Sequence, residues 1–370
     1  MNMMFVEDCC EILDSMRIPI TAADRKEGEY PYYGANGIQD YVAGYIFDDE
    51  LVLLAEDGGN FGSKEKPIAY RVSGKCWVNN HAHVLKPKAG LNVDYLCYSL
   101  MFYKVDGMVN GATRQKLTQS AMRKMQIPSR CMEEQKHIVD ELNRIIKIKE
   151  QRQQELQLLD ELIKARFVEM FGDESNPLGW DVVNVEDVAT VQVGVVIKPA
   201  QYYTDAANGV RAFRSLNIGS MYIKDNDWVY FSEEGNSKNA KSILKENDLI
   251  IVRSGAPGTA CVVTKEYAGC NAIDIIIAHP DMNKVNPYYL CAYTNLPHGK
   301  RQIDEGTGGA AQQHFNVGKY NKLQLMLPPI EKQDEFVLFM EQVDKSKVVI
   351  QAALDKSQLL FDSLMQKYFG

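Results

Sequence analysis

The sequence predicts an α+β protein in which two pseudo-repeated, mainly β globular domains with short helices are separated by two long helices that form an intramolecular antiparallel coiled coil. Two observations lead to this prediction. The segment 132–172 recurs at 330–370 with the same spacing of apolar residues, and the sequence ahead of each copy also repeats. We therefore expect four parts: a domain at 1–131, a helix at 132–172, a domain at 173–329 and a helix at 330–370.

The long helices are predicted from matching ends and a regular apolar seam. Glu133-Glu134-Gln135 returns as Glu331-Lys332-Gln333, 198 residues later. Apolar residues spaced alternately three and four apart are typical of a coiled coil. At about 1.5 Å per residue, such a helix is roughly 57 Å long, and it needs a long partner that the other copy supplies. The seam residues are Leu142, Ile145, Leu156, Leu159 and Ile163 in the first copy and Met340, Val343, Ile350, Leu354 and Phe361 in the second, with Lys149 and Arg152 interrupting the first.

Ahead of each long helix, short apolar runs between Gly, Asp and Asn residues predict β-strands. These runs are 41–47, 51–55, 68–72 and 82–85 in the first repeat and 228–231, 249–252, 260–263 and 273–278 in the second. A short helix follows, at 94–103 and 287–294. A Gly/Gln-rich loop and a strand that ends at proline, 125–128 and 325–329, complete each repeat. Proline marks the boundary because it donates no N–H and disfavours helix in the residue before it.

Composition places the chain among ordinary folded proteins. It has 370 residues, 45% hydrophobic and 24% charged. No run of about 20 apolar residues and no leader pattern predicts membrane association or secretion, so we expect a cytoplasmic protein with no membrane partner. Eight cysteines without a C-x-x-C pair read as buried thiols in a reducing compartment. Cys76 with His81 and His83 could be a metal cluster, but strand alternation explains the trio more simply, and we predict no metal site.

Motifs for catalysis are missing. The sequence holds no G-x-x-x-x-G-K-[ST], no G-x-G-x-x-G that opens a helix, no H-E-x-x-H and no G-x-S-x-G. Asn286-Pro287-Tyr288-Tyr289 is similar to the Asn-Pro-Pro-Tyr motif of adenine methyltransferases, yet its second proline is absent and the matching Asn92-Val93-Asp94-Tyr95 lacks the motif. A helix start with proline in its first turn accounts for it. We predict neither a catalytic residue nor a cofactor.

Polar and basic side chains gather in matching loops of the two repeats, and such side chains reach base edges and phosphates. Helices that pair antiparallel would relate the domains by a pseudo-two-fold axis, which suits duplex DNA. Net charge is −8 without a basic tail, so DNA contact must come from local patches. For Gln115 and Gln313, a buried glutamine that binds the backbone is an equal alternative. The candidates for DNA binding are Tyr33, Asn36, Lys64, Asn79, Asn80, His81, Arg114, Gln115 and Lys116 in the first repeat and Arg211, Arg214, Lys238, Lys241, Arg253, Gln312, Gln313 and His314 in the second.

With these residues in view, the chain resembles the specificity subunit of type I restriction-modification systems. The resemblance rests on the tandem plan, on Gly111-Ala112-Thr113-Arg114-Gln115 with Ile127-Pro128, and on Gly309-Ala310-Ala311-Gln312-Gln313 with Leu327-Pro328-Pro329. It implies a non-catalytic subunit whose two target recognition domains each read half of a bipartite site in double-stranded DNA. It also implies that the long helices dock two modification (methyltransferase) subunits, with restriction subunits joining the complex.

Two other functions stay open from the sequence alone. One is a stand-alone DNA methyltransferase or nuclease, which the missing motifs disfavour. The other is a coiled-coil protein scaffold that makes no contact with DNA.

Overall fold

The computed structural model describes residues 2–111, 114–307 and 315–370. The predicted long helices are found as α4 (Met132–Phe171) and α9 (Ile330–Phe369), each of 40 residues. The chain forms two compact units, and the division runs through both helices. Unit 1 holds residues 1–154 and 351–370, and unit 2 holds residues 155–350. The four predicted segments therefore describe the sequence repeat rather than the compact units, because each unit takes half of each long helix.

Unit 1 contains a six-stranded sheet in the order β2-β7-β5-β6-β3-β4. Its strands are β2 (Cys10–Ile12), β3 (Glu27–Gly34), β4 (Gly37–Val42), β5 (Phe47–Ala55), β6 (Ala69–Val78) and β7 (Ala82–Pro87). All pairs are antiparallel except β3 with β6. The predicted strand at 41–47 is wrong as one element, since the chain leaves β4 at the sheet edge and turns at residues 43–46 before it enters β5.

The other elements of unit 1 connect this sheet to α4. They are β1 (Met3–Phe5), which pairs with β10 (Gln126–Pro128), the hairpin of β8 (Val109–Asn110) and β9 (Lys116–Leu117), the helices α1 (Val6–Cys9), α2 (Val93–Met101) and α3 (Gln119–Arg123), and the 3-10 turns η1 (Asp14–Met16) and η2 (Ala22–Asp24). Helix α2 packs against β5 and β6, and the core of the unit lies between them. The prediction of a helix at 94–103 is confirmed.

Unit 2 repeats this strand order with one strand divided in two. Strands β12-β19-β16-β17 form one sheet and β13-β15-β14-β18 another. In unit 1, β6 pairs antiparallel with β5 and parallel with β3; in unit 2, β17 pairs with β16 and β18 pairs parallel with β14. The strands are β12 (Ala189–Val193), β13 (Tyr203–Thr204), β14 (Gly209–Phe213), β15 (Val229–Ser232), β16 (Leu249–Val252), β17 (Ala260–Val262), β18 (Asn271–Ala272) and β19 (Ile275–Pro280). The predicted strand at 249–252 is confirmed. The strand predicted at 273–278 is found as β19, which begins two residues later than predicted.

The remaining elements of unit 2 correspond to the connections of unit 1, with additions. They are β11 (Val182–Asn184), which pairs with β20 (Gln324–Met326), the helices α5 (Glu233–Lys238), α6 (Pro287–Asn295), α7 (Pro297–Thr307) and α8 (Val317–Asn321), and the 3-10 turns η3 (Val185–Asp187), η4 (Pro199–Tyr202), η5 (Ser215–Asn217), η6 (Ala240–Ser242) and η7 (Lys265–Tyr267). Helix α7 follows α6 at a place where the described part of unit 1 has turns. It supplies part of the extra length of the second repeat.

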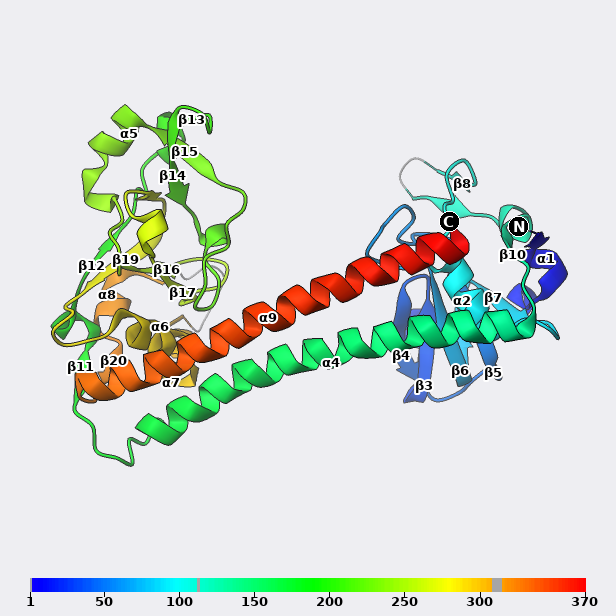
Figure 1. Cartoon of the computed structure of the whole chain (residues 1–370), viewed down its shortest axis with the longest axis horizontal. Helices are drawn as coiled ribbons and strands as arrows, with labels where there is room; N and C mark the ends of the chain where they lie inside the picture. The colour runs from blue at the N-terminus through cyan, green and yellow to red at the C-terminus, as the bar shows by residue number, and fades with distance from the viewer. Residues whose placement is uncertain (1, 112–113, 308–314) are drawn as a thin grey trace. The chain divides into compact units, whose positions relative to one another are not determined.

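Within each unit, the ends of the two long helices pair antiparallel. In unit 1, where Figure 1 shows the red end of α9 beside the start of α4, Tyr368 donates a hydrogen bond to Glu141 at 2.6 Å. In unit 2, Lys347 lies 2.7 Å from Asp160. The predicted seam is buried at Leu142, Ile145, Ile163, Met340, Val343 and Phe361 and half-buried at Leu156, Leu159, Ile350 and Leu354. Lys149, which interrupts the seam, donates to Gln358 and lies over the ring of Phe361.

A buried glutamine joins each long helix to its globule. Gln135 accepts the Asn92 N–H at 2.8 Å and donates to the carbonyls of Gly90 and Arg130 at 3.0 and 2.9 Å. Asn92 caps α2, so the glutamine fixes the start of α4 against the start of α2. Unit 2 has a glutamine with nearly the same hydrogen bonds.

There, Gln333 accepts the N–H of Asn286, the cap of α6, at 2.8 Å. It donates to the carbonyls of Lys284 and Pro328. Both glutamines are at most 1% exposed. The junction between long helix and globule is therefore built in the same way twice.

We expect Gln135→Ala and Gln333→Ala each to lower the free energy of unfolding by about 1–3 kcal/mol, because each leaves one N–H and two carbonyls buried without a partner. Urea unfolding of the full chain measures this. Gln154→Ala, which removes an exposed glutamine from α4, is the control and should change stability by less than about 0.5 kcal/mol. Equal effects of all three substitutions would contradict the assignment.

Candidate nucleic-acid interface

In unit 1, the loop that carries Arg114, Gln115 and Lys116 is attached to the end of the central strand β5. Glu56 follows this strand directly, and its carbonyl accepts the Leu117 N–H at 2.7 Å. The Gly58 N–H in turn donates to the carbonyl of Gln115 at 3.1 Å. The recognition loop, defined as residues 114–117, is therefore part of the rigid frame of the sheet.

Most of the predicted residues of unit 1 meet at this point. Asn36 donates to the carbonyl of Gly58 at 2.9 Å. Asp57 contacts both His81 and Arg114, at 2.6 and 2.7 Å. The side chains of Arg114 and Lys116 are 60% and 50% exposed, so both reach solvent although each pairs with a carboxylate.

Two predicted residues of unit 1 have supporting positions. Asn79 is buried, accepts the His81 N–H at 2.8 Å, and donates from its own N–H to the carbonyl of Tyr33. It holds the turn that carries the exposed Asn80. Tyr33 is half-buried beside Tyr70, and burial raises its pKa. Lys64 lies further along the loop that contains Gly58.

A buried charged cluster beneath the recognition loop is a feature that the sequence did not reveal. It consists of Asp14, Arg17, Glu56, His83 and Gln119. Arg17 donates to Glu56 and to the carbonyl of Ala82, both at 2.7 Å, and Lys116 lies 3.0 Å from Glu56. Asp14 and His83 of this cluster are 69 positions apart in the sequence, so only the folded sheet brings them together.

Hydrogen bonds hold both acids of the cluster in the ionised form. Burial would raise the pKa of Glu56, but hydrogen bonds from Arg17 and Lys116 outweigh it and keep the pKa below its usual value. Burial likewise opposes ionisation of Asp14, and hydrogen bonds from His83, Gln119 and the Val84 N–H lower its pKa. Asp14, Glu56 and His83 have the ligand types and spacing of a metal site. The carboxylate oxygens of Asp14 and Glu56, however, already accept N–H donors from neighbouring side chains.

Unit 2 attaches its equivalent loop in the same way but with the opposite charge. Arg253 follows β16, and its carbonyl accepts the Phe315 N–H at 3.0 Å. Its guanidinium donates to the carbonyl of Phe315 at 3.3 Å and pairs with Asp274. Gln312, Gln313 and His314, predicted to bind DNA, lie outside the described residues.

The other predicted residues of unit 2 lie elsewhere in the unit. Arg211 on β14 packs over the rings of Trp228 and Tyr267, 5.6 and 5.2 Å from their centroids. Arg214 donates to the carbonyl of Asp227, and Lys238 pairs with Glu234 at 2.6 Å. Lys241 is exposed on η6. In the described part of the chain, none of the four binds Arg253 or Phe315, so the structure does not unite them with that loop.

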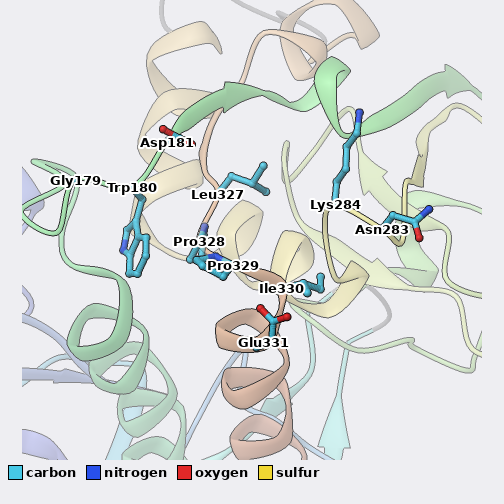
Figure 2. Close-up of a pocket in the computed structure, with 10 residues that line it drawn as sticks. All are labelled: Gly179, Trp180, Asp181, Asn283, Lys284, Leu327, Pro328, Pro329, Ile330 and Glu331. Atoms are coloured by element: carbon cyan, nitrogen blue, oxygen red, sulfur yellow. The ribbon is translucent and has the colours of Figure 1, made fainter.

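A hollow of about 590 Å³ lies at another place in unit 2, beside the start of α9. Figure 2 shows Trp180, Pro328 and Pro329 around it, with Lys284 on the opposite wall. None of the residues predicted to bind DNA lines it. Across the described ranges, no helix has both the length and the apolar character needed to cross a bilayer.

Comparison with known proteins supports the repeat. A family model described as the type I restriction modification DNA specificity domain matches residues 1–158 and again residues 177–357. A type I restriction enzyme specificity subunit of Haemophilus influenzae, S.HindORF215P, is 28% identical over 354 residues, 92% of this chain and 86% of that protein. The StySPI specificity subunit of Salmonella potsdam is 20% identical over 356 residues, 86% of this chain and 74% of that protein.

Solved structures share the fold. The crystal structure of the type I restriction-modification S subunit from M. genitalium aligns with a TM-score of 0.59 at 12% identity, covering 100% of this chain and 96% of that one. A chain solved in a study of complex assembly and conformational transition of the type I R-M system aligns with a TM-score of 0.60 at 15% identity, covering 100% and 97%. The predicted α+β fold is thus confirmed.

The lowered pKa values of Asp14 and Glu56 predict how the stability of unit 1 changes with pH. A carboxyl with a depressed folded-state pKa stabilises the fold above its unfolded pKa of about 4, and this contribution is lost as the pH falls through the folded-state pKa. Glu56→Gln should therefore destabilise unit 1 more at pH 7 than at pH 3. Urea unfolding followed by Trp77 fluorescence, with Trp180 and Trp228 replaced by Phe, measures it. Exposed Glu133→Gln is the control, and an effect of Glu56→Gln that is the same at both pH values would refute the prediction.

Proposed function

This chain belongs to the family of type I restriction-modification DNA specificity proteins, and we propose that its two domains, 1–131 and 173–329, each read one half of a bipartite DNA site. Subunits of this family are non-catalytic and act with DNA and with other subunits of the restriction-modification complex. The observation that carries the proposal is the repeated anchor: in both units the residue that follows the central strand accepts the N–H of a residue that comes directly after a polar stretch of the sequence, Leu117 in unit 1 and Phe315 in unit 2.

The residue that follows the central strand has a different charge in the two units, although its backbone makes the same hydrogen bond. Glu56 in unit 1 is replaced in the equivalent position by Arg253 in unit 2. Two anchors with the same backbone bond but different side chains suit two readers of different sequences. A site made of two unlike half-sites needs such a pair.

Arg114 and Lys116 are the best candidates for DNA contact in unit 1. Both are at least half exposed, and each is held by a carboxylate that leaves some of its N–H donors free. Arginine binds guanine through two donors, and lysine binds guanine or phosphate. In unit 2, the residues next to Phe315 hold the equivalent place in the chain.

We also propose that exposed apolar residues on the long helices dock the two modification subunits, with restriction subunits joining through the complex in the cytoplasm. Large apolar side chains on a helix surface mark interaction sites when several occur together. On the α9 segment of unit 2, Val348 and Val349 are each 69% exposed, and Leu338 is 60% exposed. On the α4 segment of the same unit, Leu158 is 60% exposed.

Methylome sequencing of a host that carries the system tests the reading of DNA. We expect methylation at a split sequence, and we expect the double variant Arg114→Ala with Lys116→Ala to relax one half only, since a lost base contact costs about 1–3 kcal/mol of discrimination. Exchange of residues 173–329 for another recognition domain should alter the other half. Lys104→Ala, an exposed lysine of unit 1 outside the loop, is the control. Methylation at no defined split sequence would disprove bipartite reading and leave the coiled-coil scaffold as the alternative.

Docking is tested by co-purification with the modification subunits. The double variant Val348→Lys with Val349→Lys should weaken co-purification at least about tenfold, because it places two charges in an apolar interface, while the exposed positions leave the fold of the chain unchanged. Ile197→Lys, at a 79% exposed apolar residue of the unit 2 globule, is the matched control. Loss of the partner with Ile197→Lys alone would place docking on the globule instead.

A further inference from the structure

We propose that His83 is a positioning residue for DNA reading by unit 1, and that it fixes the recognition loop 114–117 in the arrangement that recognises the first half-site. The inference rests on the proposed function. His83 lies on β7 and is fully buried, so it does not touch DNA itself. It acts through the loop that its ring binds.

The hydrogen bonds of His83 connect Asp14 to the recognition loop. Nδ1 lies 2.7 Å from Asp14 Oδ2, and Nε2 lies 2.9 Å from the carbonyl oxygen of Leu117. A carbonyl oxygen only accepts. The Asp14 carboxylate also accepts from Gln119 and from the Val84 N–H, both at 2.9 Å, so it is ionised and accepts here too. The ring therefore lies between Asp14 on one side and the recognition loop on the other, and its Nε2 donates to the loop.

Charged side chains of both signs surround the His83 ring. Asp14 and Glu56 are the carboxylates that face it, with Glu56 Oε2 at 3.7 Å from Nδ1. Arg17 and Lys116 are the cations that bind the same two carboxylates. Two basic side chains and two carboxylates thus surround the buried histidine, and the half-exposed Lys116 connects this network to the exposed face of the loop.

The network holds the recognition loop from two sides. Leu117 donates its N–H to the backbone carbonyl of Glu56, and its own carbonyl accepts from His83, so both polar backbone groups of this residue are bound by residues of the cluster. Gln119, just beyond the loop, is bound to Asp14. Loss of the imidazole donor would leave the Leu117 carbonyl buried without its partner, and the loop would loosen.

Unit 2 shows that the fold does not require these charges. In unit 1, His83 lies opposite Leu54, two residues before Glu56; in unit 2, Ile276 lies opposite Ile251, two residues before Arg253. Ile276 therefore takes the place of His83. Val193 pairs with Ile276 in unit 2, and it therefore takes the place that Asp14 has beside His83 in unit 1. The same sheet thus forms with two apolar residues, at less desolvation cost than a buried ion pair carries.

In unit 1, the charged cluster adds a directional hydrogen bond that orients the recognition loop. The apolar side chains at Val193 and Ile276 have no hydrogen bond with which to fix an orientation, whereas the hydrogen bond from His83 specifies where the Leu117 carbonyl must lie. A loop that reads bases needs its side chains held to within a fraction of an ångström. This requirement gives a functional reason to bury the cluster.

The test copies unit 2 into unit 1 with the double variant His83→Ile and Asp14→Val. Hydrogen exchange of the full chain should become at least about tenfold faster at residues 115–117, with β5 unchanged. In the complex, methylome sequencing should show that the first half-site is relaxed and the second retained. His83→Gln, which keeps one donor, should restore part of the discrimination at the first half-site. His279→Ile, which removes the His279–Asp248 pair of unit 2 away from any loop anchor, is the control and should change neither half.

Several results would overturn the inference. Unchanged exchange of the loop, or a relaxed second half-site to match the first, would show that His83 contributes only to general stability. If the double variant fails to fold, the single variant His83→Leu, which removes both ring nitrogens, decides instead: retention of full discrimination at the first half-site by this variant would refute the role. Absence of any split sequence with the wild-type chain is a different outcome, since it refutes the proposed function and not the hold of His83 on the loop, which exchange measures independently.

Discussion

The contact on which both units depend is the buried glutamine in the first turn of each long helix. Gln135 and Gln333 bind the N–H of the residue that caps the short helix, and they also bind the carbonyl just before the long helix. A tyrosine of each short helix binds the strand that precedes the long helix: Tyr95 donates to Pro128 and Tyr289 to Met326. Two directional contacts at one corner fix the long helix to its globule, and neither could be replaced by apolar packing alone, which sets distance but not orientation.

From this corner the same frame leads to two different loops. The short helix packs on the central sheet, Glu56 or Arg253 follows the central strand, and the carbonyl of that residue accepts the N–H of Leu117 or Phe315. The side chains at this anchor differ between the units, an acid in one and a base in the other. Because backbone hydrogen bonds hold the loop, its side chains can differ between the units without any change to the fold. A protein that must recognise two sequences on one scaffold requires this separation of frame from chemistry.

Much of the frame was predictable from the sequence because its signals are local. The heptad seam and the prolines before it located both helices, and apolar runs located β5, β16 and β7. The strand β3 was missed because Glu27-Gly28-Glu29 at its start carries charge and glycine where a strand signal needs apolar alternation. In unit 2 the counterpart of β6 is divided into β17 and β18 by the 3-10 turn η7. The apolar pattern of the sequence does not predict this turn. The cluster around His83 joins residues far apart in sequence, which become neighbours when β2 and β5 pair with β7.

The acidic net charge is compatible with reading DNA because of how the basic side chains are held. Arg114 pairs with Asp57, Lys116 with Glu56, and Arg253 with Asp274. A cation already bound to a carboxylate gains less from a phosphate, so non-specific attraction to any duplex is weak. Bound in this way, however, the same side chain has its rotamer fixed, and a correctly placed base acceptor meets a donor that loses little entropy on binding. Such pairing reduces general affinity and favours discrimination, which is the property that a specificity subunit must supply to its complex.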